Sequence, residues 1–191
     1  MGFKDSFMTM LDASPDWREA SVNYAVTARD AFGAAGLRVR SSDGRLTRDA
    51  ALLTYTRLVQ RWNLPDAQAN IWFVGAVGSA KGKEFASAST LLAPSLQVDY
   101  ETTRLYGSVN ARLFRAKDIN HDTATLRTGF SFFEADYDEV QPWLVVEVRR
   151  SRSLTDKNEV TPMLRLIHKR YFFEIGVNGS SQARASLMVT Y

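Results

Sequence analysis

Apolar and polar residues alternate along most of this chain. The final segment shows the pattern most clearly, with apolar Ala183, Ala185, Leu187, Val189 and Tyr191 separated by Arg184, Ser186, Met188 and Thr190. A period of two residues is typical of a β-strand with one apolar and one polar face. The same alternation recurs in segments 105–113, 126–133 and 144–149, so we expect an all-β chain.

The expected strands are joined by two kinds of connection. Short ones fall near residues 30, 65, 102, 138 and 170, and longer ones near 44, 85, 119 and 155, with a shorter member of the second set near 180. This order predicts an antiparallel up-and-down sheet of about 12 strands, or about 10 if segment 4–12 and one weak strand do not pair. Strands of about nine to twelve residues are close to the ~9–11 residues that cross a bilayer.

Segment 49–61 is compatible with two registers. Leu52 and Leu58 on one face place Arg57 on the other, whereas Leu53 and Val59 favour the opposite choice. The side on which Arg57 lies therefore depends on which register the strand adopts.

The composition changes this picture little. Hydrophobic residues make up 45% and charged residues 24%, and mean hydropathy is −0.23. No apolar run approaches the ~18 residues of a membrane helix, but membrane strands dilute hydropathy because only alternate residues face lipid. The chain has no cysteine, so it forms no disulfide. We interpret residues 1–191 as a single domain.

The last strand ends on an aromatic residue, Tyr191, with no polar tail. In this it resembles the final strand of Gram-negative outer-membrane β-barrels. The resemblance implies a transmembrane β-barrel in the bacterial outer membrane, with short turns on the periplasmic side. It also implies contact with the lipid bilayer and lipopolysaccharide, and a role for Tyr191 as the signal read by the barrel-insertion machinery. Because segment 1–6 has no apolar signal sequence, we expect that an export signal has been removed.

If the more apolar face of each strand meets lipid, the other face points into the barrel. A charge facing lipid at midplane costs ~2–4 kcal/mol, so the charged side chains should line the lumen. The expected lumen residues, among which arginines outnumber carboxylates about two to one, are Glu19, Arg38, Arg40, Arg57, Asp99, Arg112, Arg127, Glu147, Arg149, Arg165, Glu174 and Arg184. They could form ion pairs that brace a closed interior, or give a water-filled lumen a positive potential that favours anions.

Catalytic chemistry finds little support in the sequence. His121 is expected in an outer loop and His168 at the periplasmic end of a strand, so they should not share a site. Neither histidine has a serine at a motif-like spacing, and no phosphate-binding or metalloprotease motif is present. We therefore expect a non-enzyme without metal or cofactor. The formal charge of +3 is too small to indicate a nucleic-acid partner.

Three functional hypotheses remain from the sequence. The first is an outer-membrane barrel with a narrow passage for small anionic solutes, or the membrane part of an envelope assembly. The second is a closed barrel that acts as an anchor or binds partners through its loops. The third is a soluble, lipocalin-like barrel, which would point its apolar faces inward and its charges outward.

Overall fold

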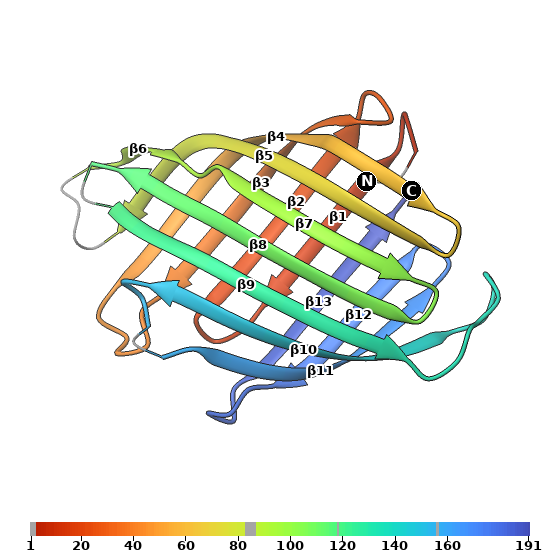
Figure 1. The fold of residues 1–191 in the computed structure, drawn as a ribbon. Coiled ribbons are helices and arrows are strands. Elements are labelled where there is room, and N and C mark those ends of the chain that lie inside the picture. Colours follow the sequence, from red (N-terminus) through yellow and green to blue (C-terminus); the bar gives the residue numbers. More distant parts are fainter. Residues whose placement is uncertain (1–2, 83–86, 118, 156) are drawn as a thin grey trace.

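The computed structural model describes residues 3–82, 87–117, 119–155 and 157–191, which form a closed antiparallel barrel (Figure 1). Its strands are β1 (Phe7–Ala13), β2 (Trp17–Ala25), β3 (Asp30–Arg40), β4 (Thr47–Leu64), β5 (Ala67–Gly82), β6 (Ser89–Leu92), β7 (Ser95–Thr102), β8 (Leu105–Ala116), β9 (Ile119–Ser131), β10 (Gln141–Arg152), β11 (Glu159–His168), β12 (Tyr171–Val177) and β13 (Ala183–Thr190). Pairing of β1 with β13 closes the ring, with Leu11 opposite Leu187.

Strands β6 and β7 share one position in the ring, between β5 and β8. Pro94 separates them, and proline has no N–H to donate to a neighbouring strand. Its carbonyl still accepts a hydrogen bond from the Leu113 amide at 2.9 Å. The thirteen strands therefore close as a barrel of twelve strand positions, which confirms the expected fold class.

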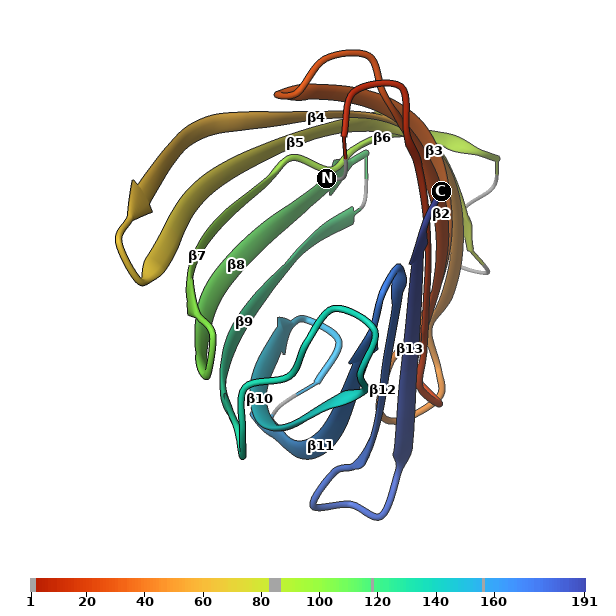
Figure 2. The same ribbon diagram turned by 90° about the vertical axis from the view of Figure 1, so that its right-hand side faces the viewer.

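The two ends of the barrel differ. One end, here called the terminal end, carries Phe7, Tyr191 and the connections 26–29, 65–66, 103–104, 132–140 and 169–170. The opposite, distal end carries the connections that begin after β1, β3, β5, β8, β10 and β12. Figure 2 views the molecule from the terminal end, with both chain ends in sight. The expected alternation of loop lengths is only partly correct, because the 132–140 connection is long and β9 begins at Ile119.

The outer face of the barrel is apolar. Leu53, Leu105 and Val109 point outward with 69%, 57% and 54% of their surface exposed. The alternation thus gives the barrel an apolar outer face, which rules against the lipocalin-like alternative. No described segment forms a helix long and apolar enough to cross a membrane.

Aromatic side chains gather on this outer face near the terminal end. The Phe7 ring lies 4.9 Å from Tyr24 and 5.8 Å from Tyr191, and Phe32 lies 5.2 Å from Tyr55. Such rings are enriched where a membrane barrel meets the water interface.

Strand β4 contains a β-bulge at Val59, where the pairing with β5 shifts between Leu58 and Gln60. The bulge explains why the sequence allowed two registers. Leu52 and Leu58 face inward before it, whereas Arg61 faces inward and Trp62 outward after it. Beyond Leu58 the strand also continues past the end of β3, whose last pair with β4 joins Asp30 to Arg57. Strand β5 runs to Gly82, close to the longer connection expected near residue 85.

Candidate functional site

The lumen is the candidate site, and its charges are balanced. The strands that the structure describes point as many acidic as basic side chains inward: Asp12, Glu19, Asp99, Glu101, Glu147, Glu159 and Glu174 against Arg48, Arg61, Arg112, Arg127, Arg149, Arg165 and Arg184. The expected excess of arginine on the inner face is therefore wrong. The residues expected from the sequence did not include Asp12, Glu101, Glu159, Arg48 or Arg61, and they included three outward arginines.

One wall of the lumen holds a continuous set of ion pairs, here called the ion-pair ladder. It comprises Arg165, Glu174, Arg127, Glu147, Arg149, Arg184 and Asp12. At one end, the Glu174 carboxylate accepts hydrogen bonds from Arg165 Nε at 2.8 Å and from Arg127 Nη2 at 2.5 Å. The hydroxyl of Ser186 donates to the same carboxylate at 3.1 Å.

Glu147 is the centre of the ladder. Its carboxylate lies 3.4 Å from Arg127 Nε and 3.2 Å from Arg149 Nε, and it accepts a hydrogen bond from Arg184. Arg184 also donates to Asp12 at 2.5 Å. Glu147 is only 2% exposed, so its charge depends on these partners rather than on water.

Two ion pairs of the lumen join strands that are not adjacent in the sheet. Arg127 on β9 reaches Glu174 on β12, although β10 and β11 lie between them in the sheet. Arg112 on β8 donates to both carboxylate oxygens of Glu19 on β2, at 2.8 and 3.1 Å. The ion pairs therefore subdivide the interior.

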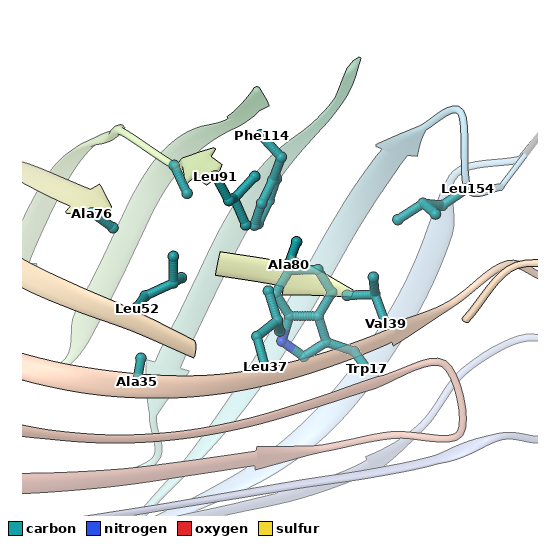
Figure 3. Packing of buried hydrophobic residues seen from close by; sticks show 11 residues of the cluster. Trp17, Ala35, Leu37, Val39, Leu52, Ala76, Ala80, Leu91, Phe114 and Leu154 are labelled. Atoms are coloured by element: carbon teal, nitrogen blue, oxygen red, sulfur yellow. The ribbon is translucent and has the colours of Figure 1, made fainter. Parts of the chain in front are cut away.

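Towards the distal end, apolar side chains fill the lumen (Figure 3). We call this cluster the apolar seal; it comprises Trp17, Ala35, Leu37, Val39, Leu52, Ala76, Ala80, Leu91, Ala93, Phe114 and Leu154. The Trp17 and Phe114 rings, from β2 and β8, meet edge to face at 6.0 Å across the lumen. Arg149 lies 5.3 Å from the Trp17 ring, so the seal and the ladder are in contact.

His121 packs against the seal. It belongs to β9 and is 2% exposed, so the prediction of an outer loop is wrong. Its ring stacks on Phe114 at 4.3 Å, and Nδ1 accepts a hydrogen bond from Arg48 at 3.0 Å if the proton is on Nε2. Among the described residues, no group of acidic, histidine or cysteine side chains could hold a metal ion.

Towards the terminal end the lumen widens into a cavity of about 930 Å³. Arg127, Arg165 and Arg184 of the ladder line one side. On the other side Asn70 accepts from Arg61 Nε and donates to Asp99, both at 2.7 Å. The Lys169–Arg170 turn also lines the cavity, so the cavity opens at the terminal end.

The structure brings most of the expected lumen residues together. Those that point inward are Glu19, Asp99, Arg112, Arg127, Glu147, Arg149, Arg165, Glu174 and Arg184. Tyr191 lies at the terminal end on the outer face, where its amide donates to the Phe7 carbonyl at 2.9 Å.

Arg38, Arg40 and Arg57 face outward, so their assignment to the lumen is wrong. Arg38 pairs with Asp49 at 2.5 Å with 58% of its side chain exposed. Arg40 lies on the same face of β3 as Arg38, because Leu37 and Val39 on the opposite face pack into the seal. Arg57 pairs with outward-facing Asp30 at 2.9 Å, in the part of β4 that precedes the bulge.

Comparison with known proteins supports the fold. No family model matches the chain, and no curated protein matches it. Among solved structures, the KdgM porin aligns over 97% of this chain and 98% of its own, with a TM-score of 0.55 and 12% identity. The same porin in complex with disordered oligogalacturonate aligns equally well. OccK8 (OprE) of Pseudomonas aeruginosa aligns over 92% of this chain and 57% of its own, at a TM-score of 0.45 and 9% identity. The alignment with the KdgM porin shows that the two chains share a β-barrel fold, in agreement with the expected outer-membrane localisation.

Proposed function

We propose that this barrel forms a narrow passage for small anionic solutes, and that the arrangement described above is its closed state. The supporting observation is that arginines of the ion-pair ladder also line the open cavity. A guanidinium carries five N–H donors, so an entering carboxylate or phosphate can bind Arg127 or Arg165 while Glu174 keeps its own hydrogen bonds to them.

The likeness to a porin that has been solved with oligogalacturonate adds to this proposal. Oligogalacturonate is a chain of sugar acids, and this cavity offers arginines together with the Trp72 and Tyr106 rings, which suit the polar and apolar faces of a sugar. We extend the proposal to sugar acids as the class of solute, and we assign no catalytic role.

The second candidate is a closed barrel that serves as an anchor or binds partners through its loops. The Glu19–Arg112 bridge and the Trp17–Phe114 contact favour it, because both cross the lumen. In either case we propose that the terminal end faces the periplasm and that Tyr191 is read by the insertion machinery.

Recording from the folded protein in planar bilayers under a salt gradient distinguishes the two candidates. We expect a small conductance with an anion-selective reversal potential. Arg61→Gln combined with Arg165→Gln should shift that potential towards zero, because both side chains line the cavity.

Arg57→Gln is the matched control, since Arg57 lies on the outer face of the same strand as Arg61. It should leave selectivity unchanged. If the folded barrel conducts no ions, even after Trp17 and Phe114 are truncated, the passage is excluded and the anchor function is favoured.

A further inference from the structure

The outer face of β2 to β5 carries a basic row near the distal end. Arg18 pairs in register with Arg38, Arg38 with Asp49, and Asp49 with Lys81. Arg38 is engaged by Asp49 through two hydrogen bonds of 2.5 and 3.1 Å. Arg18 and Lys81 have no carboxylate partner among the described residues, so the row has an excess of positive charge at both ends.

A hollow of about 720 Å³ lies directly below this row on the membrane side. The next row of outward positions consists of the small residues Ala20, Gly36, Ala51 and Ser79. A Cβ atom added at Gly36 would meet no atom within 4 Å. The hollow is therefore open to whatever lies beside the barrel in the bilayer.

We propose that this surface binds one lipopolysaccharide molecule, with phosphates on Arg18 and Lys81 and an acyl chain in the hollow. A basic row above an apolar hollow is complementary to a lipid that carries phosphates above its hydrocarbon. Three inter-strand spacings separate β2 from β5, about 14 Å. A headgroup of two phosphorylated sugars spans this distance better than a single phosphodiester. The inference requires the distal end to face the cell exterior, but it does not depend on solute transport.

Native mass spectrometry of the detergent-solubilised, folded barrel tests the site with added short-sugar lipopolysaccharide. We expect one lipid to be retained. Arg18→Gln combined with Lys81→Gln should weaken retention about tenfold or more. Gly36→Leu should weaken it similarly, because the new side chain occupies the hollow.

The chain offers a matched control for each change. Gly107 also lies on the outer face, where an added Cβ meets no atom within 4 Å, so Gly107→Leu should retain the lipid. Arg57→Gln removes an outward arginine at the opposite end of the barrel, and this variant should also retain the lipid. Heat-modifiable mobility on gels verifies that every variant is folded.

Retention that is undiminished in the Arg18/Lys81 variant or in Gly36→Leu would overturn the proposal. Equal retention of phosphatidylglycerol would also overturn it, since the surface would then be a general phospholipid contact. Conductance is measured on the same preparations. A failure of the lipid-binding proposal can therefore be distinguished from a failure of the proposed solute passage.

Discussion

Glu147 shows what the barrel interior requires of a single residue. It is almost fully buried, and three arginines approach its carboxylate. Removing one member of a buried ion pair leaves uncompensated charge, which costs more than the pair itself contributes. The ion-pair ladder therefore makes the interior intolerant of single neutral substitutions.

We expect Glu147→Gln to lower the free energy of unfolding by about 3–5 kcal/mol. The measurement is urea unfolding of the barrel in detergent micelles, followed by tryptophan fluorescence. Asp49→Asn is the control, because its partnership with Arg38 is exposed and should contribute less than ~1 kcal/mol. Similar losses in both variants would contradict the special role of the buried ladder.

The arginines of β3 also show where sequence reasoning fails at this scale. Alternation correctly indicated that Leu37 and Val39 share a face opposite Arg38 and Arg40. It could not indicate which face is inside, because the apolar seal makes the distal lumen as apolar as the lipid side. The missing information was the contact with Trp17 and Phe114, from distant parts of the chain.

At the scale of elements, β1 and β13 close the barrel and Tyr191 extends their pairing. Its amide and carbonyl both bond to Phe7, and its ring stacks on the Phe7 ring. Loss of Tyr191 therefore weakens the seam as well as removing one aromatic side chain from the outer face.

We expect a chain ending at Thr190 to reach the outer membrane at much lower levels than the intact chain. The reduction should exceed what the ~1.5–3 kcal/mol of one buried side chain explains. Quantitative gels of outer-membrane fractions give the measurement. Tyr137→Ala, which truncates an exposed ring in the 132–140 connection, is the control. Normal levels of the shortened chain would contradict a role in insertion.

The bulge in β4 leads to a second prediction, about deletions within this strand. Val59 is the extra residue between two regularly paired segments, so its deletion restores alternation without moving Arg61 or Trp62 to another face. We expect the variant without Val59 to fold. Deleting Leu53, which lies in a regular part of the strand, shifts the register and should prevent folding. Heat-modifiable mobility on gels measures the amount of folded barrel for each deletion. An equal loss of folded barrel in both would contradict this account of the bulge.

For the whole molecule, the sequence predicted the barrel well because alternation directly reports a half-buried strand. It could not locate the bulge or the break at Pro94, because both depend on how neighbouring strands pair. It allowed for ion pairs that brace the interior, but it expected more arginines than carboxylates on the inner face, where the structure has equal numbers. That balance arises from contacts between strands that are not adjacent, such as β2 with β8.

The apolar seal controls passage through the whole molecule if the lumen conducts. We expect Trp17→Ala combined with Phe114→Ala to increase single-channel conductance, since it removes the rings that meet across the lumen. Trp62→Ala is the control, because Trp62 lies on the outer face. An unchanged conductance in a conducting barrel would place the constriction elsewhere.

The same alternation predicts chemical accessibility over the membrane span. Single cysteines at Val109, Val146, Leu164, Ala185 and Leu187 should not react with a water-soluble thiol reagent in the inserted protein, because these positions face lipid. Cysteines that replace Met10 or Arg61 should react, since both residues line the open cavity. Reaction at the first set would contradict the assignment of faces.

The overhang of β4 beyond β3 gives the molecule a protruding β-hairpin at its terminal end. Residues 59–64 extend about 20 Å at the usual rise of a strand, and within the described part of the chain their strand pairing is with β5 alone. A cleavage sequence for a specific protease, inserted between Pro65 and Asp66, would therefore report which compartment this end occupies. In intact cells it should resist protease added from outside, and it should be cut once the periplasm is opened.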